Sequence, residues 1–568
     1  MKNNSPELPG KALPEKGVVS FLINLAAVIL GALLFAAAFP NLLVKNGIPI
    51  LAWIAYIPVF WVIRRCGFGA AFFWGALYGY AAYGLFNYWL SVFHPLAGLI
   101  VGSIYLVYLA FLFPLLKLAI VLFPRKGYIL QWLIWISFEY LRIQGFLGYA
   151  YGITGYSQWH VLPLIQIASV TGVWGVSALV VFSSAWLAAS LNDNSIDQKS
   201  NAKLQLNIKA FFRREWVSAL VWFVLLVFSL VYGFTSQIEY SDAPKARIAL
   251  IQHNTDPWRG GIDEYRRNYE VLRRLSDEAL EANPQLDLVV WSETAFVPRI
   301  WWHTTIRDDH ESWNLVKELL DYLSAQDVPF LIGNDDARRD TAKNPRGDNR
   351  VDYNASMLFE KGEITALYRK LHLVPFTEHF PYEKQLPWVY NALINADTHF
   401  WEKGTEAKVF ETGKLKFSTP ICFEDTFGYI SRNFVRNGAE LIVNISNDAW
   451  SASLPAQMQH FSMAVFRAVE NRRSMVRSTA SGQTCSIDPN GKVLAMADPF
   501  REIWLAAEVP IVKTSSFYTR HGDWLPPVFI SLSLILLIFG IISAIIKGNK
   551  KIAISAISKR KPGGMRSR

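Results

Sequence analysis

Three residues whose side chains can cooperate in covalent catalysis stand in the second half of the chain, each near the end of a strand-like segment. Glu293 lies in the segment WSETA, Lys370 in YRKLHLVPFTEHFP and Cys422 in PICFEDTF. A buried carboxylate can exchange protons, a lysine can stabilise negative charge on an oxygen, and a thiol can form a covalent intermediate. Singly, each also fits an ordinary role: a salt-bridged glutamate, a surface lysine, a small buried hydrophobe. The combination is therefore more informative than any one of them.

A fourth motif, NISNDAW over Asn444–Trp450, follows another strand-like run. The segment after it, QHFSMAVFRAVENRR over Gln459–Arg473, predicts a helix on which Arg467 and Glu470 face one side. We interpret this segment as an ordinary amphipathic helix rather than as a carrier of catalytic groups.

The elements around these residues alternate between short apolar strands and amphipathic helices throughout region 236–524. Such alternation predicts a layered α/β domain, in which reactive residues sit on loops at strand ends. We expect strands over Arg247–His253, Leu286–Trp291, Pro329–Gly333, Lys416–Cys422 and Leu441–Ile445, and helices over Glu264–Ala282 and Trp313–Gln326.

The rest of the chain is too apolar for a soluble protein. Of 568 residues, 52% are hydrophobic and only 18% are charged, which favours an integral membrane protein. Apolar runs long enough to cross a bilayer are expected at 18–38, 47–63, 69–91, 96–124, 127–142, 162–190, 216–235 and 525–546. The sequence thus predicts a membrane domain over 1–235 with about seven transmembrane helices, an extramembrane domain over 236–524, a last span over 525–546 and a basic tail over 547–568.

Loop charges predict the orientation. Lysine and arginine gather in alternate loops, at Arg64–Arg65, Arg125–Lys126 and the stretch from Lys199 to Arg214, and again in the tail. Cytoplasmic loops carry such an excess. We therefore expect both termini in the cytoplasm and region 236–524 on the opposite face.

The cysteine and histidine pattern predicts no metal site. The chain has three cysteines, Cys66, Cys422 and Cys485, an odd number that excludes complete internal pairing. No cysteine and histidine cluster has zinc-ligand spacing. We expect Cys485, in GQTCSID, to be structural.

Glutamate, lysine and cysteine in this order resemble the nitrilase superfamily. The local words WSETA, HLVPFTEHFP, ICFED, SNDAW and FRAVENRR, with FEYLRIQGFLGYAYGITGYSQ and YTRHGDWL in the membrane part, resemble the apolipoprotein N-acyltransferase family over nearly the whole chain. The resemblance implies a multi-span α-helical membrane domain and a nitrilase-like αββα sandwich. It also implies a monomer without cofactor in the bacterial cytoplasmic (inner) membrane, with the catalytic domain facing the periplasm.

The resemblance further implies a reaction. The family moves an acyl chain from a glycerophospholipid, typically phosphatidylethanolamine, to the α-amino group of the S-diacylglyceryl cysteine of an apolipoprotein. Glu293 would be the general base, Lys370 the oxyanion stabiliser and Cys422 the nucleophile that carries the acyl group as a thioester. The backbone N–H of Phe423 would assist Lys370.

Other positions match supporting residues of the family. Glu378 and Glu424 match supporting carboxylates, while Trp258 and Trp450 match tryptophans that contact substrate. Three positions depart from the family: Phe423 stands where tyrosine is frequent, and Thr377 and Ser451 replace a glycine and a bulky aromatic residue. These leave the triad intact.

Two alternatives stay open at the level of sequence. A membrane-tethered nitrilase or amidase would use the same three residues with water as acceptor, although a hydrolase of small soluble amides needs one anchor at most. A lipoprotein-binding membrane protein with an inactive nitrilase fold is the second alternative. The presence of all three triad residues argues against it.

Overall fold

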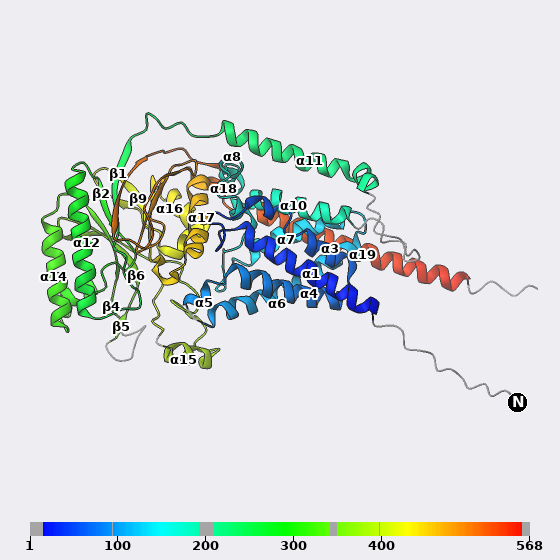
Figure 1. The fold of residues 1–568 in the computed structure, drawn as a ribbon, viewed down its shortest axis with the longest axis horizontal. Coiled ribbons are helices and arrows are strands. Elements are labelled where there is room, and N and C mark those ends of the chain that lie inside the picture. The colour runs from blue at the N-terminus through cyan, green and yellow to red at the C-terminus, as the bar shows by residue number, and fades with distance from the viewer. Residues whose placement is uncertain (1–14, 94, 192–207, 341–348, 397, 559–568) are drawn as a thin grey trace, which may run out of the picture.

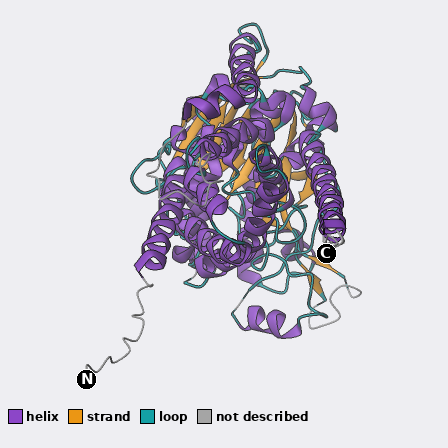
Figure 2. Cartoon of the chain, turned by 90° about the vertical axis from the view of Figure 1, so that its right-hand side faces the viewer, coloured by secondary structure: helices purple, strands orange, loops and turns teal. Residues whose placement is uncertain are grey.

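The computed structural model describes residues 15–93, 95–191, 208–340, 349–396 and 398–558. A helical part and a strand-containing part lie side by side along the long axis of the molecule (Figure 1). When the molecule is turned to look along that axis, the helices stand in front of the strands (Figure 2). The structure therefore has the two parts that the composition predicts.

The helical part consists of the N-terminal elements and the last helix. Its elements are α1 (Glu15–Ala38), α2 (Pro49–Ala52), α3 (Ile57–Arg65), α4 (Phe68–Phe86), α5 (Leu90–Phe93), α6 (Ala97–Leu122), α7 (Gly127–Leu141), η1 (Thr154–Gln158), α8 (Leu162–Ile165), α9 (Ala168–Thr171), α10 (Val173–Ser190), α11 (Ile208–Thr235) and α19 (Leu525–Ser558). Within the described ranges, five helices contain a segment long and apolar enough to cross a membrane: Gly17–Ala38, Ala97–Leu122, Val173–Ser190, Arg214–Thr235 and Leu525–Ile546.

Three of the apolar runs expected from sequence are not single helices. In the run over 69–91, α4 ends at Phe86 and α5 begins at Leu90. The run over 47–63 is divided between α2 and α3. The run over 162–190 is divided into α8, α9 and α10, and Gly172 between α9 and α10 has a φ of 65°. A left-handed residue stops an α-helix, so only α10 continues as a long helix. Apolarity alone could not show this break, because all three helices contain buried apolar residues.

The strands form two six-stranded sheets. The first has the order β14-β1-β2-β3-β6-β7 and the second the order β13-β12-β11-β10-β9-β8. The first sheet contains β1 (Lys245–Gln252), β2 (Leu288–Trp291), β3 (Phe330–Asp335), β6 (Asn354–Glu360), β7 (Glu363–Arg369) and β14 (Ile503–Pro510). The second contains β8 (Phe410–Glu411), β9 (Lys416–Ser418), β10 (Leu441–Ser446), β11 (Met475–Thr479), β12 (Cys485–Ile487) and β13 (Val493–Met496); β4 (Arg338–Arg339) and β5 (Arg350–Val351) form a small ribbon.

The alternating direction of side chains along the strands explains the layers. On β1, Ile248 and Leu250 belong to the larger hydrophobic cluster, which also contains residues of the second sheet, whereas Ala249 and Ile251 belong to the cluster with the outer helices. The outer helices are α12 (Ile262–Ala282) and α14 (His310–Ser324). Successive side chains of a strand point to opposite faces, so the first sheet packs on the second with one face and on these helices with the other.

The second sheet is covered by α16 (Gly428–Arg436) and α17 (Leu454–Asn471), which lie between it and the spanning helices (Figure 1). Helix α17 is buried on every side. One contact with the membrane part is Gln459, which donates to the carbonyls of Pro40 and Phe86. The order helix, sheet, sheet, helix is the predicted αββα sandwich, which the structure confirms. The remaining helices are α13 (Ile300–Thr305), α15 (Pro387–Asn395), α18 (Phe517–His521), η2 (Cys422–Thr426) and η3 (Asp448–Ser451).

Candidate active site

Glu293 lies directly after β2, at the edge where the parallel strands end. Its side chain is only 5% exposed. The Nδ2 group of Asn354 donates to its Oε1 atom at 2.8 Å, and the backbone N–H of Asn447 donates to its Oε2 atom at 2.8 Å. Gly333 on β3 permits this turn, because a Cβ atom there would lie 2.7 Å from the Cα of Glu293. The carboxylate is thus fixed from two directions.

Lys370 follows β7 and points into the same buried space. Its Nζ atom lies 3.2 Å from Oε1 of Glu293 and 2.8 Å from Oε1 of Glu378, and its side chain is fully buried. Burial alone lowers the pKa of Lys370, but the carboxylates of Glu293 and Glu378 more than offset this and hold that pKa well above the ordinary value. The ammonium is therefore charged at neutral pH and available to an oxyanion.

Cys422 opens the short helix η2. The predicted strand over Lys416–Cys422 was too long, because β9 ends at Ser418 and only an isolated bridge from Ile421 to Ile445 continues the pairing. Cys422 has a φ of 49°, a backbone conformation that ends a strand and turns the side chain out of the sheet. It is half-buried and unpaired.

The electrostatic surroundings of the Cys422 thiol keep it protonated. Burial raises its pKa most, and the carboxylates of Glu293 and Asp448 raise it further, while Lys370 and the Ser446 hydroxyl lower it. The net result is a pKa well above the usual value. Because the thiolate is the nucleophilic form, chemistry at this sulfur requires a base, and Glu293 is the carboxylate with the largest influence on it.

Glu424 joins the two loops that carry Lys370 and Cys422. Its carboxylate accepts hydrogen bonds from the Tyr368 hydroxyl at 2.8 and 2.9 Å and from the backbone N–H groups of Leu371, His372 and Ile421 at 2.7, 3.0 and 2.8 Å. Burial raises the pKa of Glu424 to about 7, and these donors limit the rise. Its geometry is that of a positioning residue.

Glu378 performs a similar task on the other side of Lys370. Its Oε2 atom accepts a hydrogen bond from the backbone N–H of Val374 at 2.8 Å, while its Oε1 atom holds the ammonium. Phe423, the predicted neighbour of the nucleophile, is 7% exposed and packs against Phe427 with ring centroids 5.0 Å apart. The structure therefore brings Lys370 into direct contact with Glu293 and Glu378, and it places Cys422 within the electrostatic reach of Glu293 and Lys370.

The two predicted substrate-contacting tryptophans meet at the junction with the membrane part. Trp258 and Trp450 make an edge-to-face contact with centroids 5.1 Å apart, and both rings also contact Phe93 of α5. Trp258 is 61% exposed and Trp450 is 37% exposed. Large aromatic side chains left this open beside apolar helices are suited to contact with lipid chains.

Sequence reasoning missed a buried charge network behind the site. His460 on α17 contacts Oδ1 of Asp448 at 2.9 Å through Nδ1 and Oδ1 of Asp425 at 2.7 Å through Nε2. Arg477 on β11 pairs with both aspartates. Burial opposes the charge on His460, but Asp425 and Asp448 outweigh it and raise the pKa of His460 to about 9. Asp425 belongs to the ICFED motif, but its separation from His460 in the sequence does not show that the two side chains meet.

No metal site accompanies these groups: within the described ranges, no set of three His, Cys, Asp or Glu side chains is placed to hold an ion. The chemistry that the side chains can support is proton transfer, nucleophilic attack by sulfur and stabilisation of an oxyanion.

Comparisons with known proteins identify the family. The profile described as Carbon-nitrogen hydrolase matches residues 247–518, and the profile described as Apolipoprotein N-acyltransferase N-terminal domain matches residues 31–186. "Apolipoprotein N-acyltransferase 1" of Treponema denticola is 44% identical over 542 residues, which are 93% of this chain and 98% of that protein. The chain belongs to the apolipoprotein N-acyltransferase family.

Further members of the family show the same extent of similarity. "Apolipoprotein N-acyltransferase 1" of Treponema pallidum is 47% identical over 90% of this chain and 94% of its own length. "Apolipoprotein N-acyltransferase" of Geobacter metallireducens is 33% identical over 90% of this chain and 94% of its own length. With the five apolar helices, family membership makes this chain a multi-pass bacterial membrane acyltransferase.

Proposed function

We propose that this enzyme transfers an acyl chain from a glycerophospholipid, with phosphatidylethanolamine as donor, to the α-amino group of the S-diacylglyceryl cysteine of an apolipoprotein. The acyl group passes through a thioester on Cys422. The observation that carries the proposal is the buried contact of Lys370 with Glu293 and Glu378, beside a protonated thiol, in a chain with membrane-spanning helices. The transfer would complete lipoprotein maturation.

The first half-reaction begins with the donor ester beside the thiol. Glu293 accepts the thiol proton as the Cys422 sulfur attacks the ester carbonyl. The carbonyl oxygen becomes an oxyanion, which the ammonium of Lys370 and the backbone N–H of Phe423 stabilise. When the tetrahedral intermediate collapses, the C–O bond breaks, Glu293 returns the proton to the alkoxide, and lysophospholipid leaves.

The second half-reaction uses the same groups. The α-amino group of the acceptor attacks the thioester carbonyl, and Glu293 accepts a proton from the nitrogen. The C–S bond then breaks, and the proton on Glu293 returns to the Cys422 sulfur. The products are an amide and the resting thiol, so the enzyme follows ping-pong kinetics.

The raised pKa of the resting thiol supports the separate roles of Glu293 as the base and Lys370 as the stabiliser of the oxyanion. A permanently ionised sulfur would compete with the oxyanion for Lys370, whereas a thiol gives up its proton only as the new C–S bond forms. Positive charge is then free at the moment when the oxyanion develops, which is the condition for stabilising a transition state more than a ground state.

The proposal also includes the setting. Residues 236–524 face the periplasm, 1–235 and 525–546 lie in the inner membrane, 547–568 are cytoplasmic, and the enzyme acts as a monomer. Trp258 and Trp450 contact the acyl chain of the substrate. Their exposure at the junction with α5 supports this placement.

Intact-protein mass spectrometry after incubation with phospholipid tests the central step. We expect one added acyl mass on the wild-type protein and on Cys485→Ala, none on Cys422→Ala, and removal of the adduct by hydroxylamine or by a diacylglyceryl peptide. Adduct formation on the Cys422→Ala protein, or an adduct that the peptide acceptor leaves in place, would contradict the proposed intermediate.

A further inference from the structure

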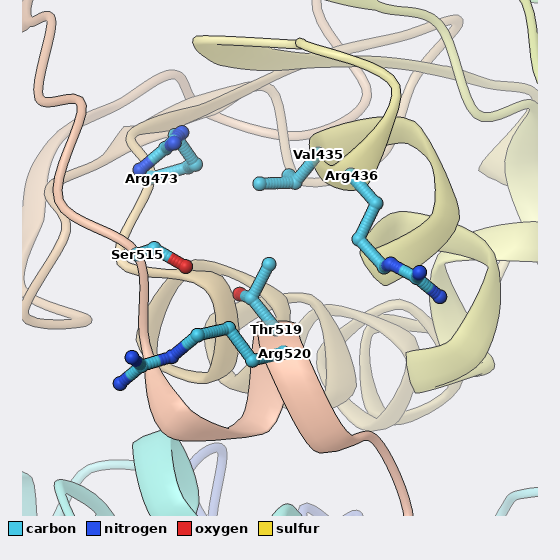
Figure 3. A pocket seen from close by; sticks show the side chains of 6 residues that line it. All are labelled: Val435, Arg436, Arg473, Ser515, Thr519 and Arg520. Atoms are coloured by element: carbon cyan, nitrogen blue, oxygen red, sulfur yellow. The ribbon is translucent and has the colours of Figure 1, made fainter.

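A second pocket is lined by three arginines that have no carboxylate within ion-pair distance in the described part of the chain. It has a volume of about 360 Å³ and is lined by Val435, Arg436, Arg473, Ser515, Thr519 and Arg520. Figure 3 shows Arg473 and Arg520 on one side of it and Arg436 on the other. The residues come from the end of α16, from the residues that follow α17 and from α18 with the segment before it. None belongs to the catalytic arrangement.

Arg473 forms the inner wall of this pocket and is only 6% exposed. Its guanidinium donates to the backbone carbonyls of Ala439 at 3.2 Å and Thr514 at 2.6 Å. The neighbouring carboxylate, Glu440, is already paired with Lys513 at 2.8 Å. Glu440 acts on Arg473 electrostatically but forms no ion pair with it. A buried cation that is only partly compensated is unfavourable, so this position favours the arrival of an anion.

Arg436 and Arg520 add two exposed guanidinium groups at the mouth of the pocket. In the described part of the chain, no carboxylate lies within ion-pair distance of either group. Arg520 makes one long hydrogen bond, 3.4 Å, to the carbonyl of Ser516. Guanidinium groups bind phosphate oxygens in bidentate fashion, and the hydroxyl side chains of Ser515 and Thr519 line the same space.

The pocket lies at the start of the last spanning helix. Arg520 precedes by five residues Leu525, where the apolar segment Leu525–Ile546 begins. Between them stands Trp524, which is 37% exposed and contacts the ring of Phe517. Half-exposed aromatic residues at the end of a spanning helix mark the level of the lipid head groups. Lipid phosphates therefore lie at the height of the pocket.

We propose that the pocket formed by Arg436, Arg473 and Arg520 binds the phosphate group of a membrane phospholipid, at a site separate from the acyl donor at Cys422. The bound lipid would supply the ion-pair partner that Arg473 lacks and hold α18 against the bilayer. Free inorganic phosphate offers the same chemistry without the anchorage to the membrane. The experiment must therefore distinguish the two sources.

Native mass spectrometry of the full-length protein in detergent tests the proposal. The protein carries Cys422→Ala, so that no acyl chain is transferred and the result does not depend on the proposed function. It is titrated with phosphatidylglycerol, with diacylglycerol of the same chains, and with inorganic phosphate as competitor. The variants are Arg436→Gln/Arg520→Gln, the charge-retaining Arg436→Lys/Arg520→Lys, and Arg307→Gln as a control beside α14, at the end of the molecule away from the membrane helices.

We expect the Gln double variant to retain one phosphatidylglycerol fewer, with an affinity at that site reduced at least about tenfold. The Lys double variant keeps the charge but loses the bidentate geometry, so its affinity should lie between those of the parent and the Gln double variant. The control should bind as the parent protein does. Equal retention by the parent and the Gln double variant would overturn the proposal. Retention of diacylglycerol at this site equal to that of phosphatidylglycerol would also overturn it. A third contradicting result would be that millimolar inorganic phosphate binds there while the variants leave the retention of phosphatidylglycerol unchanged.

Discussion

Replacing Lys370 by methionine removes the only cation that contacts Glu293 and Glu378 among the described residues. The Nζ atom lies 3.2 and 2.8 Å from the two carboxylates. At an effective dielectric constant of about 20, these separations correspond to Coulomb attractions of roughly 5 and 6 kcal/mol. Desolvation offsets most of this, so we expect a net loss of about 3–5 kcal/mol in the free energy of unfolding when the cation alone is removed.

The loss should depend on pH in a direction that the structure fixes. In the wild-type protein the pKa of Lys370 is higher in the folded state than in the unfolded state. The stabilisation by its ammonium is therefore constant at every pH below the unfolded-state pKa, which includes pH 5.5–8. In Lys370→Met the two buried carboxylates repel each other, so a folded-state carboxyl pKa rises above its unfolded value. The resulting penalty is present at pH 8 and shrinks as pH falls and one carboxyl group takes up a proton.

Two measurements check this prediction. Thermal unfolding in detergent should give a deficit in Tm for Lys370→Met that is clearly smaller at pH 5.5 than at pH 8. Single-turnover acylation of Cys422 should slow by roughly 10²–10³-fold, as for loss of an oxyanion donor. Lys361→Met, at an exposed lysine in the turn between β6 and β7, should change neither quantity. A pH-independent deficit, or acylation within fivefold of wild type, would refute the reasoning.

Two further predictions concern groups around the site. The pKa of His460 is raised to about 9, so the charged imidazole stabilises the fold fully below its unfolded pKa of about 6.5, and this stabilisation is lost as pH rises through 9. Tm should therefore fall over this interval in the wild type, and it should fall less in His460→Gln. Parallel curves of Tm against pH for the two proteins would contradict the assigned charge on the imidazole. Trp450→Ala and Trp258→Ala should leave Tm within about 1 °C, since both rings are exposed. Both substitutions should slow acylation of Cys422 by a long-chain phospholipid more than acylation by a short-chain one. Equal effects on the two donors would exclude contact of these rings with the lipid chain.

Much of the fold could be predicted because its elements carry local signals. The strand predicted over Leu286–Trp291 corresponds to β2, and the helix predicted over Glu264–Ala282 corresponds to α12. In both segments the apolar period and the flanking polar residues agree with the structure that forms. The spacing of Arg467 and Glu470 likewise predicted that they face one side of a helix, and on α17 their side chains form an ion pair at 3.0 Å.

Other features depend on contacts that no local pattern records. Helix α17 is amphipathic in sequence, but it is buried on every side because a second layer of helices covers the face that would otherwise meet water. The turn at Cys422 depends on Glu424, whose side chain accepts hydrogen bonds from another loop, and the reach of His460 to Asp425 and Asp448 depends on tertiary packing. The triad and the carboxylates Glu378 and Glu424 could be expected from motif and resemblance, whereas the contacts that hold these side chains in place required the structure.

The position of α17 between the second sheet and the membrane helices has a practical consequence. The guanidinium of Arg467 donates to the hydroxyl of Tyr156, and that of Arg472 donates to the side chain of Gln166. Cutting the polypeptide near residue 236 would remove these two acceptors from buried donors and expose the apolar surface of α17 that now packs on the membrane helices. A water-soluble catalytic fragment can therefore be purified only if the exposed apolar surface is redesigned first, or if the membrane helices are kept.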